Sequence, residues 1–281
     1  MRTRIPTHTT ARSGEGIPPG SPRPRRRRRL VAPLLSALFA AALTAASATP
    51  ALAVYNGSRA DSDEYAWAVR VELAYPEGIA SCTGSLITED TVVTAAHCIS
   101  NNGRSPSAIA VTFHYGQKRS EYTIGVARAV PMPHYDPARI KDDISLLFLD
   151  SAVSEPTIEL ASTPAPVGAE VTVAGYGCTG DPFNPAAQCD PAPRLVETRL
   201  TAVPAEACPD IAGPWQFCTY SPHTSANRGD SGGPVIWSDH GDQKLVGVTN
   251  AIELPPAPAY LNLSASVPYE LDWIRATAGL R

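Results

Sequence analysis

The fold of this 281-residue chain is decided by two short strings, Thr94-Ala95-Ala96-His97-Cys98 and Gly229-Asp230-Ser231-Gly232-Gly233-Pro234. The first places a histidine after an apolar run, Thr91-Val92-Val93, which has the composition of a buried strand. The second places a serine between glycines, which lack a Cβ and let backbone N–H groups approach a reacting atom closely. Between the two strings, Asp143 directly precedes another apolar run, Ile144-Ser145-Leu146-Leu147. Histidine, aspartate and serine in this order are the parts of an acyl-transfer triad.

Each of the three side chains has a chemical role that the others make possible. The Ser231 hydroxyl is a weak nucleophile and needs a general base within hydrogen-bond reach. His97 can be that base, because an imidazole with a pKa of about 6.5 exchanges a proton near neutrality. Asp143 would hold the imidazole in the correct tautomer. Asp142 is the rival acid, and we expect it to face solvent because Asp143 is the one that adjoins the strand.

Together the strings resemble the chymotrypsin/trypsin-like serine proteases, over about residues 54–281. The resemblance implies an all-β fold of two packed six-stranded antiparallel β-barrels with a C-terminal helix and a catalytic cleft between the barrels. It implies a secreted endopeptidase that acts on protein or peptide substrates as a monomer, with no cofactor and no metal.

The resemblance also assigns roles to residues around the triad. The N–H groups of Gly229 and Ser231 would form the oxyanion hole, and Asp230 would pair with a new N-terminal amine. Val54-Tyr55-Asn56-Gly57 loosely matches the family's activated N-terminus and directly follows Ala51-Leu52-Ala53. Signal peptidase would therefore create the activating amine on Val54. The substrate pocket would be formed by Ser225, Ala226, Arg228, Asn250, Ile252 and Tyr260.

The chain departs from the family pattern around this pocket. Asn227 stands where a cysteine is usual, and Asn250-Ala251-Ile252 replaces the common Ser-Trp-Gly. At the pocket base, Ser225 has no charge to pair with a basic side chain. We therefore expect cleavage after small or apolar residues. The same departures leave open a second class of function, a catalytically weak or inactive binding or regulatory protein.

All six cysteines follow the leader, as disulfides in an oxidising compartment would. Spacing alone allows fifteen pairings. The resemblance selects Cys82–Cys98 and Cys208–Cys218 and leaves Cys178 and Cys189 to pair with each other. A zinc site made by His97 and Cys98 is the alternative interpretation, although the two residues are adjacent and lack a C-x-x-C partner.

Residues 1–53 read as a secretory signal with a long basic n-region. Arg25–Arg29 precedes the apolar run Leu30–Ala46, and Ala51-Leu52-Ala53 fits the cleavage site. A membrane anchor and a twin-arginine signal are the alternatives. We expect secretion, with membrane contact only transiently through the signal peptide. The Ala, Pro and Arg bias is typical of a high-GC bacterium.

The remaining chain, 54–281, has 14 basic and 26 acidic residues, a net charge near −12, which excludes nucleic acid as a partner. Short alternating runs separated by turn clusters predict strands within 67–73, 110–113, 144–149, 170–174, 195–201, 235–237 and 245–249. We expect the first barrel over about 54–155, the second over about 165–265 with a Pro/Ser/Thr-rich link at 151–166, and a helix over about 268–278. His114, His134, His223 and His240 lie in turn-rich stretches and should be surface residues.

Overall fold

A computed structural model describes residues 54–61, 63–100, 103–114, 121–184, 189, 192–208, 213–253 and 260–281. These residues belong to one compact unit, Thr49–Arg281. The signal-peptide prediction for 1–53 lies outside the described residues. Within the described part of the chain, the helices are too short or too polar to cross a membrane.

The first barrel closes on itself in the strand order β2-β3-β4-β7-β6-β5. Each pairing is antiparallel, and β2 completes the ring by pairing with both β3 and β5. In β2 buried residues alternate with partly exposed ones, as expected for a strand with one face on a core. The strands are β2 (Ala68–Tyr75), β3 (Gly78–Thr88), β4 (Thr91–Thr94), β5 (Ala108–Phe113), β6 (Tyr122–Pro131) and β7 (Ser145–Leu149).

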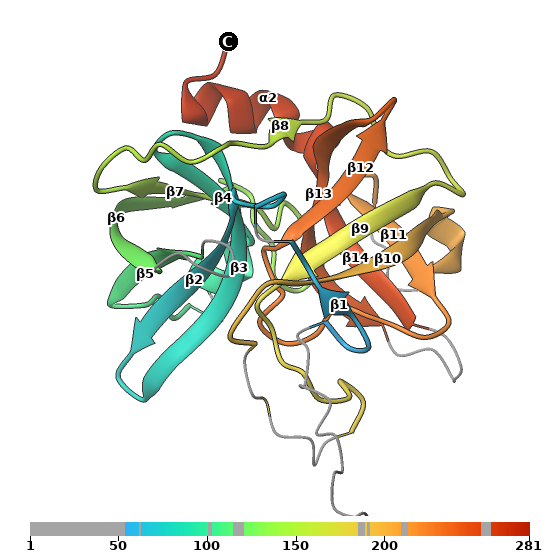
Figure 1. Ribbon diagram of the computed structural model, residues 1–281. Helices are drawn as coiled ribbons and strands as arrows, with labels where there is room; N and C mark the ends of the chain where they lie inside the picture. The colour runs from blue at the N-terminus through green and yellow to red at the C-terminus, as the bar shows by residue number, and fades with distance from the viewer. Residues whose placement is uncertain are drawn as a thin grey trace, which may run out of the picture. The chain divides into compact units, whose positions relative to one another are not determined.

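The second barrel also has six antiparallel strands, in the order β10-β11-β14-β13-β12-β9, and is closed by the pairing of β9 with β10. Figure 1 shows these yellow-to-red strands beside the blue-green strands of the first barrel. The strands are β9 (Glu170–Gly175), β10 (Val196–Val203), β11 (Gln216–Ser221), β12 (Pro234–Asp239), β13 (Asp242–Glu253) and β14 (Tyr260–Ser266). The predicted fold class is confirmed.

The predicted start of the first barrel, at residue 54, is wrong. The two-residue strand β1 (Ser58–Arg59) pairs with β10 of the second barrel, and Tyr55 bridges to Ser225. The strands of the first barrel begin only at Ala68. In the 151–166 link, β8 (Glu159–Leu160) pairs with β13 in parallel. The physical reason is the position of Val54, which is fully buried against the second barrel.

The C-terminal helix α2 (Val267–Ala278) begins one residue earlier than predicted and ends at the predicted residue. The Ser266 side chain caps its N-terminus by accepting from the N–H of Tyr269, and Gly279 ends it in the left-handed conformation at φ 72°. Val267, Leu271 and Ile274 are buried in the same apolar cluster as the first-barrel strands. The helix thus fixes the end of the chain against the rest of the fold.

Thr83 of β3 joins the two barrels through three hydrogen bonds. Its hydroxyl donates to the Gly229 carbonyl at 2.9 Å and accepts from the Tyr176 N–H at 3.1 Å, while its N–H donates to the Ser231 carbonyl at 2.8 Å. Thr83 is completely buried, so these bonds are shielded from water. The loop that carries Ser231 is therefore held directly against the first barrel.

Candidate active site

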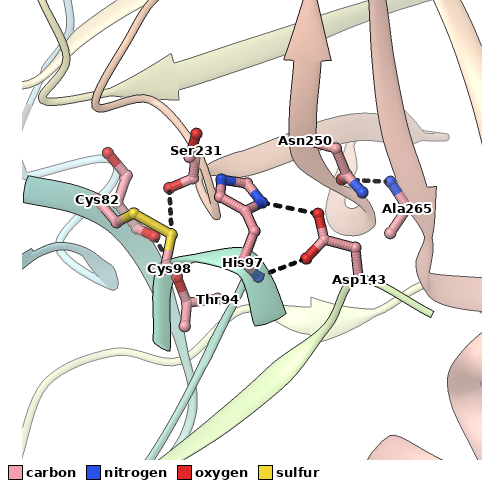
Figure 2. A network of polar contacts seen from close by, with 9 residues as sticks. Cys82, Thr94, His97, Cys98, Asp143, Ser231, Asn250 and Ala265 are labelled. Atoms are coloured by element: carbon pink, nitrogen blue, oxygen red, sulfur yellow. Dashed lines mark hydrogen bonds and ion pairs between the residues drawn. A yellow bond between two sulfur atoms is a disulfide. The ribbon is translucent and has the colours of Figure 1, made fainter. Parts of the chain in front are cut away.

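His97 is presented by α1 (Ala96–Ile99), a single helical turn that follows the buried strand β4. Asp143 faces it from the start of β7 and is only 1% exposed. Its carboxylate accepts from the His97 backbone N–H at 2.7 Å and pairs with the ring Nδ1 at 2.8 Å (Figure 2). These two bonds fix both the position and the orientation of the imidazole.

The surroundings of His97 act on its pKa in opposite directions. Burial favours the neutral ring and lowers the pKa, whereas the charge of Asp143 and its hydrogen bond favour the charged ring. The Asp143 contributions outweigh burial, so the pKa of His97 lies above its ordinary value of 6.5. The imidazole is therefore a stronger base than a free histidine.

Asp142 does not contact His97, and the expectation that it faces solvent is wrong. Its side chain is buried, lies 3.7 Å from Lys141 Nζ and is hydrogen-bonded to the carboxyl of Glu270. His114, also expected at the surface, is buried as well. It pairs with Glu121 at 2.9 Å and stacks on Tyr176 at 4.6 Å between ring centroids.

Ser231 lies beside His97, and both line one cleft. Its carbonyl faces Cys98 Sγ at 3.8 Å (Figure 2), and Figure 2 draws no hydrogen bond between its hydroxyl and the ring. Such bonds in free enzymes are often long and shorten only when substrate binds. A Cβ on the neighbouring Gly232 would lie 2.1 Å from Thr94 Oγ1 and 2.4 Å from the Thr83 carbonyl, so only glycine permits this close approach.

The backbone N–H groups of residues 228–233 fall into two sets. Those of Arg228, Asp230, Gly232 and Gly233 each donate to a defined acceptor. Those of Gly229 and Ser231 have no acceptor in the described part of the chain. Because the Arg228 carbonyl accepts from Cys178 N–H at 2.6 Å, the Gly229 N–H across the same planar peptide points away from residue 178. The two unpaired donors are those predicted for the oxyanion hole.

Asp230 lies beneath this loop with no exposure to solvent. Its carboxylate accepts from the N–H groups of Gly177 and Asn227, each at 2.8 Å, and from that of Val54. Burial raises the pKa of Asp230 to about 7, although the three N–H groups act to lower it. With a peptide N–H rather than an amine at Val54, the carboxylate has no counter-charge among the groups that hold it.

The predicted pocket residues differ in exposure. Ser225 and Ala226 are fully enclosed, Asn250 is buried, Ile252 and Tyr260 are partly exposed, and Arg228 is exposed. Asn250 Oδ1 accepts from the Ala265 N–H at 2.8 Å (Figure 2). Tyr260 stacks on Phe183 at 5.0 Å between ring centroids. These contacts do not join the six residues to one another, so the pocket stays a prediction.

Two asparagines have roles in the site that were not predicted from the sequence. Asn262 Oδ1 accepts from the Ser225 hydroxyl at 3.0 Å and from the Ala226 N–H at 2.9 Å, which closes the predicted pocket base. Its signal was the alternation Leu261-Asn262-Leu263, which places a polar side chain on one face of a buried strand. Asn227, noted only as a missing cysteine, donates from Nδ2 to the carbonyls of Cys178 at 2.8 Å and Gly180 at 2.6 Å. It thus ties the Ser231 loop to the 178–189 loop.

The structure contains the disulfides Cys82–Cys98, Cys178–Cys189 and Cys208–Cys218. Cys82, His97 and Cys98 lie close enough together to resemble a metal-ligand cluster. The zinc alternative nevertheless fails, because a sulfur in a disulfide is not the thiolate that a zinc site requires.

The cleft that holds Ser231 and His97 has a volume of about 470 Å³. It extends along the β2–β3 hairpin on the first barrel, where the ion pair of Arg104 and Glu77 forms part of its wall. The lining residues are Leu73, Tyr75, Glu77, Gly78, Ile79, Ala80, Ser81, Cys82, His97, Cys98, Arg104 and Ser231. An extended peptide could therefore reach the serine from this side.

Comparison with known proteins agrees with this geometry. The family model "Trypsin" matches residues 54–274. The chain belongs to the trypsin family. It is thus a serine endopeptidase by class.

Three relatives show how far the similarity extends. Mouse (Mus musculus) cathepsin G is 30% identical over 240 residues, covering 80% of this chain and 85% of cathepsin G. Serine protease SP24D of Anopheles gambiae is 33% identical over 209 residues, covering 70% and 72% of the two chains. Trypsin eta of Drosophila erecta is 26% identical over 260 residues, covering 86% and 96%. These relatives are animal proteins, and the bacterial source inferred from composition stays a prediction.

The contacts of Asn227 can be tested with the near-isosteric substitution Asn227→Asp. It removes both amide donors and places a second carboxylate beside buried Asp230, so we expect the free energy of unfolding to fall by about 2–4 kcal/mol. Urea unfolding of the two proteins measures the difference. Asn56→Asp makes the same change at an exposed site and should cost less than about 1 kcal/mol. Equal losses in the two variants would contradict a buried tie at Asn227.

Proposed function

We propose that the protein is a secreted endopeptidase that cleaves peptide bonds through an acyl-enzyme on Ser231. The observation that carries the proposal is the His97–Asp143 pair, with bonds of 2.7 and 2.8 Å, beside Ser231 in one cleft. The mechanism needs a base whose tautomer is fixed, and a carboxylate on Nδ1 leaves Nε2 free to take a proton.

In the first half-reaction, Ser231 Oγ attacks the substrate carbonyl carbon and its proton passes to His97 Nε2. The developing oxyanion accepts hydrogen bonds from the N–H groups of Gly229 and Ser231, which have no other acceptor in the described part of the chain. His97 then returns the proton to the leaving amine as the C–N bond breaks. In the second half-reaction water attacks the acyl-enzyme by the same route and restores the serine.

The second candidate is a binding or regulatory protein on the same fold. It is favoured by the replacement at Asn250-Ala251-Ile252 and by the enclosed pocket base. Against it stand the His97–Asp143 geometry and the two unpaired N–H groups, for which a protein without turnover has no use. The endopeptidase is therefore the better supported of the two.

A fluorophosphonate probe separates the two functions, because it reacts only with a serine that a base activates. We expect the protein that begins at Val54 to be labelled and Ser231→Ala to remain unlabelled. Asp143→Asn should lower kcat by about 10⁴-fold, the effect of this change in a trypsin-type triad.

The control for this experiment is Ser154→Ala, which removes an exposed serine of the 151–166 link. It should be labelled like the unmodified protein. If the folded protein that begins at Val54 is not labelled, the binding function is the correct one. If Asp143→Asn costs less than about tenfold, the acid is misassigned.

Activation by signal peptidase is the second part of the proposal. Val54 has φ +56°, a left-handed conformation that is strained for a β-branched residue. Cleavage before Val54 removes the preceding carbonyl and with it this strain. It also converts the N–H that faces Asp230 into an ammonium group, which supplies the missing counter-charge. No separate zymogen stage is then needed.

This activation can be tested by comparing a chain that begins at Val54 with one that retains Ala53. We expect the extended chain to be labelled at least about 10²-fold more slowly, because a buried unpaired carboxylate costs several kcal/mol. In the extended chain the raised pKa of Asp230 means that the folded state holds its proton longer than the unfolded state. Its unfolding midpoint should therefore fall as the pH rises from about 4 to about 7.

In the chain that begins at Val54, activity should fall at low pH as His97 becomes charged. It should also fall at high pH, above the ordinary amine pKa of about 7.7–8.0, as the Val54 amine loses its proton. Mass spectrometry of the secreted protein locates the start of the chain. An active secreted protein that begins upstream, for example at Ala48, would overturn this mode of activation.

The preferred substrate side chain follows from the base of the pocket. The Ser225 hydroxyl is already bonded to Asn262, and both groups are neutral, so a buried lysine or arginine would lack a counter-charge. We infer a small or apolar residue at P1, the residue whose carbonyl is attacked. The 470 Å³ cleft on the first barrel would then hold the leaving side of the substrate.

Two peptide substrates that differ only in Ala or Arg at P1 test this preference. We expect kcat/KM to be at least about 10²-fold higher for the alanine substrate, because the arginine would be buried unpaired. In Ser225→Asp the ratio should narrow, since the new carboxylate can pair with the arginine. An unmodified enzyme that cleaves both substrates equally, or prefers arginine, would show the pocket assignment to be wrong.

A further inference from the structure

The backbone directly before Asp143 is strained at two positions. Ile140 has φ +47° and Asp142 has φ +52°, both in the left-handed region. Such a residue costs of order 1–3 kcal/mol and persists only where its surroundings hold it. Paired hydrogen bonds between Asp136 and Lys141, each 3.0 Å, hold the start of this turn. At Asp142, next to the acid that orients His97, the carbonyl accepts from the Ile144 N–H at 2.9 Å, and the side chain makes a further contact.

Glu270, in the first turn of α2, supplies that contact. Its carboxyl is hydrogen-bonded to the carboxyl of Asp142, and each residue is only 6% exposed. The two are more than 120 positions apart in sequence, and α2 contacts β7, the strand that Asp143 precedes. Lys141 flanks the pair, with Nζ 3.7 Å from Asp142 Oδ2 and 5.2 Å from the centre of the Trp215 ring. The strained turn is thus anchored to the C-terminal helix.

Two carboxyl groups can share a hydrogen bond only if one of them keeps its proton, because an ionised carboxylate only accepts. The protonated partner is Glu270. Burial and the adjacent Asp142 raise the pKa of Glu270 to about 7, against a smaller lowering by Lys141. Glu270 Oε1 has no hydrogen-bond partner in the described residues, which suits a neutral acid better than a charged one.

The other charged groups near α2 do not neutralise Glu270. Lys244 of β13 and Glu159 of β8 pair with each other at 3.2 Å, and β7 has no titratable residue. On the helix itself Asp272 is exposed and Arg275 lies in the last turn. Asp142 and Lys141 are therefore the groups that decide its charge.

We propose that Glu270 is a positioning residue, which donates its proton to Asp142, holds the strained 140–142 turn and so keeps Asp143 aligned with His97. Loss of that proton places two negative charges side by side in a buried site and releases the turn. The inference rests on the proposed peptidase function only for its activity readout, since the carboxyl pair exists whatever the site does.

The Asp142–Glu270 pair and His97 change activity in opposite directions as the pH rises. As the pH rises above the pKa of His97, the imidazole becomes neutral and the base becomes competent. Over the same range Glu270 loses its proton and the alignment weakens. The folded state also binds this proton more tightly than the unfolded state, so its contribution to stability falls as the pH rises from 4.5 to about 7.

The substitution Glu270→Gln tests the proposal, because an amide donates to Asp142 at every pH. In the enzyme that begins at Val54, we expect kcat of this variant to equal that of the unmodified enzyme at pH 6 and to exceed it severalfold at pH 8.5. Glu270→Ala should lower kcat by about 10- to 10²-fold at both pH values with little change in KM, as a misplaced catalytic group does. Asp272→Asn, an exposed acid of the same helix, should match the unmodified enzyme throughout.

The stability of the protein gives a readout that does not depend on activity. Both proteins carry Ser231→Ala in this measurement. Between pH 4.5 and 7.5, the unfolding midpoint should fall less in the protein with Glu270→Gln than in the protein that keeps Glu270. If the unmodified enzyme takes no probe, the peptidase function fails and this measurement still tests the carboxyl pair. Identical pH profiles of Glu270 and Glu270→Gln, in kcat and in midpoint, would overturn the proposal even if Glu270→Ala does not fold.

Discussion

The buried carboxylate of Asp230 is the constraint on which the candidate site depends. It lies under the residues that carry Ser231, and three backbone N–H groups from three separate segments converge on it. Only glycine fits at positions 175 and 177, because a Cβ on Gly175 or Gly177 would lie within 3 Å of the Asp230 carboxylate. The segment 54–59 runs against the second barrel, so its first residue reaches the same point. One buried carboxylate thus joins Val54, the residues that follow β9 and the serine loop.

Most of the fold could be predicted because short sequence patterns indicate its strands, its last helix and the residues of the triad. The apolar run that follows Asp143 made it the better partner for His97 than Asp142, and the structure pairs it with His97. The alternating runs indicated strands in both barrels, and proline near the start of the last element indicated a helix. Each of these features depends on residues that are close together in the sequence, so the sequence alone is sufficient to predict it.

What escaped prediction depends on contacts between distant segments. Asp142 was expected in solvent, yet it is buried beside Glu270, from the far end of the chain. His114 stacks on Tyr176 of the other barrel, and Asn262 of β14 reaches Ser225, which follows the neighbouring strand β11. The first barrel was expected to begin at about residue 54. In the fold, however, the segment extends toward Asp230 on the second barrel. The alternation around Asn262 marks a polar side chain in a buried strand, but no local pattern gives the partner of any of these residues.

The bridge between Cys82 and Cys98 has a consequence for the cell that makes the protein. It ties β3 to the helical turn that presents His97, and Cys98 Sγ also touches the Ser231 carbonyl. Where glutathione and thioredoxin keep thiols reduced, the Cys82–Cys98 disulfide cannot persist. The segments that carry His97 and Ser231 then lose this covalent support. Reduction of this one bond would therefore loosen the base and the serine together, so the redox state of the surroundings acts on both groups of the site.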